Sequence, residues 1–63
     1  MELLEKLQTE WAELSEKIVK LRIFLASQKD ELSKEEYALL MAQRYAMESY
    51  LSILRERIKL YSS

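Results

Sequence analysis

The chain has 63 residues, a formal net charge of −1, and no cysteine, histidine, glycine or proline. A single core rarely gives so short a chain much stability, so small proteins recruit disulfides, metals or further copies of themselves. The absence of cysteine and histidine excludes disulfides, a thiol nucleophile and the usual zinc ligands, and the near-neutral charge argues against binding polymeric nucleic acid.

The first expected element is a helix over about residues 2–26. Its apolar residues recur at steps of three and four, which places them on one stripe of an α-helix. They are Leu4, Leu7, Trp11, Leu14, Ile18, Leu21 and Leu25. Trp11 lies on this stripe, so we expect it to pack in the core.

A turn over about residues 27–33 is indicated by the chemistry of its last residue. Ser33 and Glu36 have the spacing of a capping box, and Leu32 and Tyr37 have the spacing of a hydrophobic staple. A second helix is therefore expected to begin at about residue 34. Because glycine and proline are absent, one continuous long helix is the alternative.

The second helix is expected over about residues 34–61, again with an apolar rhythm of three and four. Its stripe is Tyr37, Leu40, Arg44, Met47, Leu51, Leu54, Ile58 and Tyr61. Tyr61, like Trp11, is expected in the core. Arg44 occupies an apolar position, so its charge must reach solvent, pair with an acid or bind a ligand. Two stripes joined by a short turn predict an all-α fold, an antiparallel two-helix hairpin forming a single domain over residues 1–63.

The hairpin has more apolar residues than one seam needs. Those beside the stripes are Leu3, Val19, Ile23, Phe24, Leu39, Met41, Tyr45, Tyr50 and Ile53. A contiguous exposed apolar patch usually marks a contact site, so we expect hairpins to assemble into a homo-oligomeric helical bundle. An adaptor that binds a host protein through this face is the alternative. The apolar runs are too short to cross a membrane and no signal peptide is visible, so we expect a cytoplasmic protein.

Nothing in the sequence favours catalysis. The serines lack a recognisable base partner, and no glycine-rich loop is present to hold a phosphate. We therefore expect no enzyme activity, no catalytic residue, no metal site and no cofactor. The bases nevertheless form two clusters, which bind an anion or form ordinary surface ion pairs. The first is Lys17, Lys20, Arg22 and Lys29; the second is Arg44, Arg55, Arg57 and Lys59.

From Leu14 onward the chain resembles the hairpin domain shared by phage anti-CBASS and anti-Thoeris sponge proteins. The more specific residues of the resemblance are Phe24, Gln43, Met47, Tyr50 and Arg57, set among aliphatic positions that extend to Ile58. The resemblance covers about two thirds of the chain. It implies a small phage protein in the cytoplasm of the infected bacterial host, assembled as a homo-oligomer, often a hexamer.

Such sponges bind the cyclic nucleotide second messengers of bacterial immunity without cleaving them. Lys17 and Arg57 each match a basic position of the family, and the resemblance implies that Lys17 contacts a phosphate and that Arg57 serves a second ligand pocket formed among subunits. We expect both side chains to bind phosphates. Lys20 and Arg44 are expected to assist them. Trp11 or Tyr50 is expected to stack on a base. Candidate ligands are cyclic dinucleotides, cyclic trinucleotides and cyclic ADP-ribose type signals.

Overall fold

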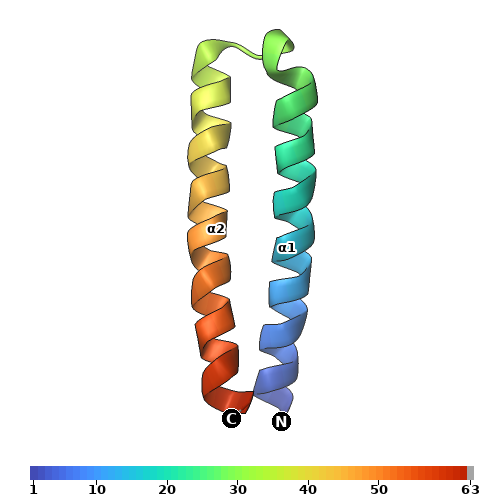
Figure 1. The fold of residues 1–63 in the computed structure, drawn as a ribbon, viewed down its shortest axis with the longest axis vertical. Coiled ribbons are helices and arrows are strands. Elements are labelled where there is room, and N and C mark those ends of the chain that lie inside the picture. The colour runs from blue at the N-terminus through green and yellow to red at the C-terminus, as the bar shows by residue number, and fades with distance from the viewer. Residues whose placement is uncertain (63) are drawn as a thin grey trace.

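The computed structural model describes residues 1–62 and shows two long antiparallel helices joined by a short connection (Figure 1). Helix α1 spans Glu2–Gln28, the short helix η1 spans Lys29–Glu31, and α2 spans Lys34–Ser62. The molecule measures 45 × 15 × 14 Å. The predicted helical hairpin is thus confirmed, and the alternative of one continuous helix is wrong. Residue 63, the last of the predicted domain, lies outside the described residues.

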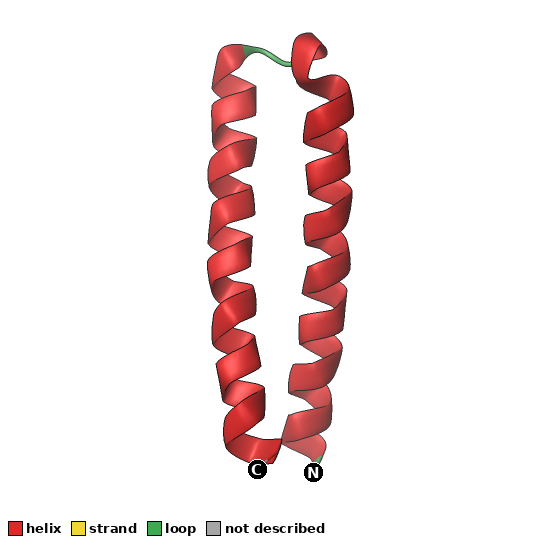
Figure 2. Cartoon of the chain, in the orientation of Figure 1, coloured by secondary structure: helices red, strands yellow, loops and turns green. Residues whose placement is uncertain are grey.

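The connection is shorter than the expected turn over residues 27–33. Helix α1 continues to Gln28 and is followed at once by η1, so only Leu32 and Ser33 of the connection lie outside helices (Figure 2). No glycine or proline is present to end α1 earlier. The backbone finally leaves the helical region at Leu32, whose φ of −92° and ψ of 145° are extended. The chain therefore reverses within a few residues.

Ser33 begins α2 as the capping signal predicts. The Glu36 amide donates to the Ser33 hydroxyl oxygen at 3.1 Å, and the Tyr37 amide donates to the Ser33 carbonyl at 2.9 Å. The return bond differs from the usual capping box, because the Ser33 hydroxyl itself donates to Glu36 Oε1 at 3.0 Å. Both side chains are still held at the helix start, where the Glu36 carboxylate also suits the helix dipole.

The core is a single seam between the two helices. Among residues 1–62, its buried apolar side chains are Leu7, Ile18, Leu25 and Leu54, and of these Leu54 is fully buried. Trp11 and Tyr61 remain 37% and 46% exposed, so the prediction that they pack in the core is wrong for the single chain. Two helices enclose only the centre of each stripe, and these large rings extend beyond it. Neither helix of residues 1–62 has the long apolar stretch that a membrane crossing requires.

Polar side chains border the middle of the seam. Arg44 Nε lies 3.2 Å from Glu48 Oε2, with the two side chains 24% and 36% exposed. The Arg44 guanidinium also lies 5.4 Å from the centre of the Tyr45 ring. On α1, the Ser15 hydroxyl oxygen is buried without a hydrogen-bond partner among the described residues. Of the outcomes open to Arg44, pairing with an acid is therefore the one observed.

Replacing Ser33 by alanine removes the hydroxyl that the Glu36 amide and carboxylate both contact. We expect Ser33→Ala to lower the free energy of unfolding by about 1 kcal/mol, the usual cost of losing such a cap. Urea denaturation followed by circular dichroism measures this change. Ser52→Ala is the matched control, because the Ser52 hydroxyl bonds only to the Glu48 carbonyl of its own helix, at 3.2 Å. Equal stability of the two variants would contradict the role of the cap.

Candidate ligand-binding face

Among residues 1–62, one side-chain hydrogen bond joins the two helices directly. The Tyr50 hydroxyl on α2 donates to Glu10 Oε2 on α1. By contrast, each of the four ion pairs of residues 1–62 lies within one helix. The bond therefore shows that the side of α1 that carries Glu10 lies beside the side of α2 that carries Tyr50. It also sets their register, with Glu10 and Tyr50 at the same level of the hairpin.

The Tyr50 hydroxyl lies near one negative side chain, Glu10, and one positive side chain, Arg57. The hydrogen bond to the Glu10 carboxylate, with some loss of hydration, raises the pKa of the Tyr50 phenol above its ordinary value of 10.0. The positive charge of Arg57 acts in the opposite direction and lowers that pKa. Arg57 is thus close enough for its charge to reach the Tyr50 hydroxyl. Tyr50 remains 39% exposed although its hydroxyl is hydrogen-bonded to Glu10.

Helical periodicity places three further residues on the same side. Residues seven apart lie two turns apart on one side of a helix. Lys17 therefore follows Glu10 along α1, and Gln43 and Arg57 flank Tyr50 along α2. The antiparallel register places Lys17 level with Gln43. We call this side the Tyr50 face and define it by Glu10, Lys17, Gln43, Tyr50 and Arg57.

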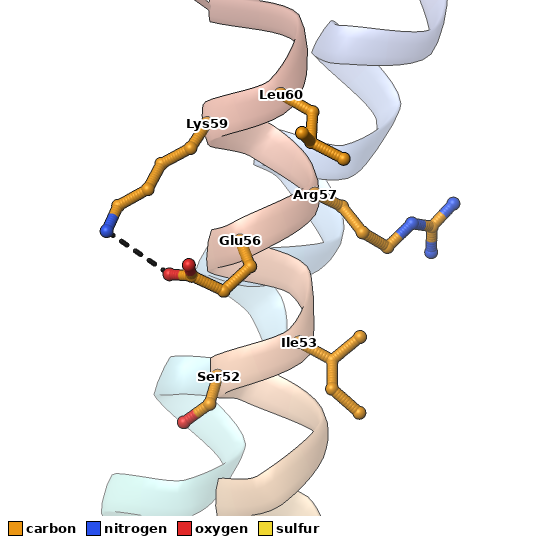
Figure 3. Close-up of a pocket in the computed structure, with 6 residues that line it drawn as sticks. All are labelled: Ser52, Ile53, Glu56, Arg57, Lys59 and Leu60. Carbon is orange, nitrogen blue, oxygen red and sulfur yellow. Dashed lines mark ion pairs between the residues drawn. The ribbon is translucent and has the colours of Figure 1, made fainter.

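Arg57 also borders a shallow hollow on the outer side of α2. Its lining is Ser52, Ile53, Glu56, Arg57, Lys59 and Leu60. Lys59 Nζ lies 3.2 Å from Glu56 Oε2 on one side of the hollow. The side chains of Ile53, Arg57 and Leu60 extend to the opposite side, away from that ion pair (Figure 3). Arg57 thus presents its guanidinium beside exposed apolar surface.

Not all predicted site residues lie on this face. Lys20 follows Lys17 by about one turn but lies 3.5 Å from Glu16 Oε1, in an ion pair. Arg44 pairs with Glu48 and lies about 100° around α2 from Gln43. Trp11 lies about 120° around α1 from Lys17. The structure therefore groups Lys17, Tyr50 and Arg57 on one face and leaves Arg44 and Trp11 on other sides of the hairpin.

Within one chain, even the grouped cations are far apart. Lys17 is level with Gln43, and fourteen residues of α2 separate Gln43 from Arg57. At the helical rise per residue, this separation is about 21 Å along the hairpin. One phosphate group cannot bridge that distance. A single chain therefore offers two separate cations with an acid and a phenol between them.

Glu10 is the member of this face that sequence reasoning missed. Its place seven residues before Lys17 is visible in the sequence, but acids at that spacing usually form only a solvated face. What marks it is its bond to Tyr50 across the hairpin. The face as a whole can donate hydrogen bonds, attract anions and stack a ring. Among residues 1–62, no group of three or more acidic side chains is placed to hold a metal ion.

The Glu10–Tyr50 bond predicts a pH-dependent contribution to stability. Because the pKa of Tyr50 is raised in the folded state, this contribution is complete below the unfolded pKa of about 10 and is lost as pH rises through the folded value. We expect Tyr50→Phe to be less stable than the wild type at neutral pH, with the difference vanishing at high pH. Urea denaturation across pH measures it, and Tyr45→Phe is the control. A difference independent of pH would contradict the assigned bond.

A match between this sequence and a known protein family adds to the geometric evidence. The model described as Sequestin matches residues 1–60, nearly the whole chain. No curated protein and no solved structure matches. The name Sequestin is compatible with a protein that sequesters a ligand. The match includes all of α1, α2 as far as residue 60, and every residue of the Tyr50 face. The chain belongs to the Sequestin family.

Proposed function

We propose that the protein is a non-catalytic phage sponge that sequesters a cyclic nucleotide immune messenger in the bacterial cytoplasm. The observation that carries this proposal is the placement of Lys17 and Arg57 on the same face as Tyr50. Neither cation belongs to the ion pairs of residues 1–62, whereas Lys6, Lys20, Arg44 and Lys59 do. The family name agrees with sequestration, and the resemblance to anti-CBASS and anti-Thoeris sponges supplies the class of ligand.

The chemistry of the Tyr50 face fits such a ligand. Cyclic nucleotides carry phosphates, which lysine and arginine bind through charge-assisted hydrogen bonds. They also carry bases, which stack on aromatic rings. Tyr50 is held by Glu10 and remains partly exposed, so its ring needs little reordering on binding. Lys20 is close enough to Lys17 to assist it, provided that it leaves Glu16.

Sequestration needs a stable complex and no bond cleavage. The proposed sponge therefore contains no catalytic residue and needs no metal or cofactor. We further propose that it acts as a homo-oligomer, because one hairpin is too thin to surround a ligand. The large apolar side chains that remain exposed, among them Leu39, Ile53 and Leu60, support association with further copies.

The same exposed apolar side chains favour a second candidate, an adaptor hairpin that binds one host protein. In that case the basic residues only pair with acids, as Lys20 and Arg44 do. Stoichiometric recovery of a single host protein, unaffected by added nucleotides and with no nucleotide binding by the purified protein, would favour the adaptor over the sponge.

Isothermal titration with cyclic dinucleotides, cyclic trinucleotides and cyclic ADP-ribose isomers tests the sponge. We expect one of them to bind, and to be recovered chemically unchanged after the protein is denatured. Lys17→Ala and Arg57→Ala are each expected to weaken binding roughly tenfold or more, because a hydrogen bond to a charged group is worth about 1.5–3 kcal/mol.

Lys34→Ala is the matched control for these substitutions. Lys34 is also an exposed lysine and belongs to no ion pair of residues 1–62, but it lies about 160° around α2 from Tyr50, outside the Tyr50 face. Its replacement should leave the affinity unchanged. Failure of the wild type to bind any ligand of the panel at tens of micromolar would reject the function. Binding that survives replacement of both Lys17 and Arg57 would reject the site.

A further inference from the structure

The Tyr50 face carries a negative charge where phosphate binding would need only positive ones. Glu10 is level with Tyr50, between the level of Lys17 and that of Arg57 along the hairpin. A carboxylate at this place opposes the binding of phosphates, because like charges repel. A glutamine side chain could accept the same hydrogen bond from Tyr50 without that penalty. The charge of Glu10 is therefore favourable only if it contacts a part of the ligand other than its phosphates.

Glu10 has the capacity for such a contact. It is exposed, and its Oε2 atom accepts from the Tyr50 hydroxyl. Among residues 1–62, its Oε1 atom accepts no hydrogen bond, and Glu10 belongs to no ion pair, not even with Arg57, whose charge reaches the Tyr50 hydroxyl. A carboxylate has two oxygens with about four acceptor sites in total. Glu10 can therefore keep its bond to Tyr50 and still accept from a ligand.

The bond between the two side chains also places Glu10 at the edge of the Tyr50 ring. A phenol hydroxyl lies in the plane of its ring, so the carboxylate that accepts from it lies beside the rim of that ring. Tyr50 is partly exposed, and a base stacks on an aromatic ring in an offset arrangement. A base stacked on Tyr50 therefore brings its own polar edge within reach of the Glu10 carboxylate.

We propose that Glu10 and Tyr50 form a base-binding subsite that selects guanine. The Tyr50 ring stacks on the base, and the Glu10 carboxylate accepts hydrogen bonds from the N1–H and N2–H groups on the base edge. Glu10 is thereby a specificity-determining residue, and the sequestered messenger contains at least one guanine. The cyclic form of the ligand rests on the function proposed above, whereas the choice of base does not.

The donor and acceptor pattern of the bases is the reason for this choice. A carboxylate only accepts hydrogen bonds, and guanine presents two adjacent N–H donors on one edge. Adenine and cytosine each place a ring-nitrogen acceptor beside their amino group, and uracil places its N–H between two carbonyl acceptors. Those acceptors are repelled by a carboxylate. Two parallel N–H donors instead match its two oxygens, which is the geometry of a bidentate contact.

The position of Lys17 agrees with a nucleotide bound in this way. Glu10 and Lys17 are seven residues apart on α1, which is about 10 Å along one side of the helix. The flexible lysine side chain shortens that gap. The base edge and a phosphate of the same nucleotide can therefore contact Glu10 and Lys17 of one chain. The acid and the base of this side of α1 then bind opposite ends of the nucleotide.

Isothermal titration with three cyclic dinucleotides that differ in one base tests the selection. We expect cyclic GMP–AMP to bind at least about tenfold more tightly than cyclic di-AMP, which is the discrimination that a bidentate base contact provides. Cyclic IMP–AMP should be intermediate, because hypoxanthine keeps the N1–H donor but lacks the amino group. Equal affinities for cyclic GMP–AMP and cyclic di-AMP would overturn the inference.

The variant Glu10→Gln tests the residue. Glutamine can still accept from Tyr50, but it has one acceptor oxygen and adds donors. The preference for cyclic GMP–AMP should fall from about tenfold to about one. The affinity for cyclic di-AMP should be unchanged or higher, because a negative charge near the phosphates is removed. An equal loss of affinity for both ligands would mean that Glu10 only positions Tyr50, and would overturn its role in selection.

The matched control is Glu5→Gln, which changes the net charge by the same amount. Glu5 is also an exposed acid of α1 outside the ion pairs of residues 1–62, but it lies about 140° around the helix from Glu10. We expect this variant to keep the preference for cyclic GMP–AMP. Loss of the preference in both variants would attribute it to overall charge and would overturn the subsite. Circular dichroism checks that both variants remain helical.

Titration with GMP and AMP, followed by proton NMR of the tyrosine rings, separates this inference from the function it rests on. A wild type that binds GMP in preference to AMP, and loses this preference in Glu10→Gln, keeps the subsite even if no cyclic nucleotide binds and the messenger assignment fails. A wild type that binds cyclic GMP–AMP and cyclic di-AMP equally keeps the function and removes the subsite. Absence of both the GMP preference and cyclic nucleotide binding rejects both.

Discussion

The structure depends on one constraint, namely that two antiparallel helices can enclose only the centre of a single stripe from each. The buried side chains of residues 1–62 are four aliphatic residues along that seam. Everything else that is apolar, including the Trp11 ring and the outer side of α2, remains in contact with water. A molecule 45 Å long and 15 Å wide has no interior in which to bury a ligand. Its binding chemistry must therefore lie on a side of the hairpin or between copies.

The polar contacts of the hairpin serve different purposes. The Ser33–Glu36 cap determines where α2 begins, and the Arg44–Glu48 pair satisfies a charge placed in the seam. The Glu10–Tyr50 bond instead connects the two helices and brings one stripe of α1 beside one stripe of α2. Because each stripe repeats every seven residues, this contact also relates Lys17 to Gln43. The Glu10–Tyr50 bond thus relates the α1 residues of the Tyr50 face to its α2 residues.

Ion pairing among residues 1–62 involves only some of the basic residues, and Arg22, Lys29, Lys34 and Arg55 belong to no ion pair either. Lys20 and Arg44 have acidic neighbours on their own helices, as surface bases commonly do. Lys17 and Arg57 belong to no ion pair of residues 1–62 and share a face with Tyr50. Their separation along a single chain is too large for one phosphate. Membership of the Sequestin family is compatible with this arrangement.

Much of the fold was decided locally, and the sequence by itself determined it. The apolar rhythm of three and four residues predicts both helices, and Ser33 with Glu36 predicts the start of α2, because these signals act within a few residues. The end of α1 was less predictable, since no glycine or proline stops it and the helix continues to Gln28. Only the tertiary structure decided which residues share a face. It placed Trp11 outside the core, gave Arg44 to Glu48, and joined Glu10 to Tyr50, a residue forty positions away. The physical reason is that periodicity orients a residue about its own helix axis, whereas its neighbours on the other helix depend on how the two helices pack.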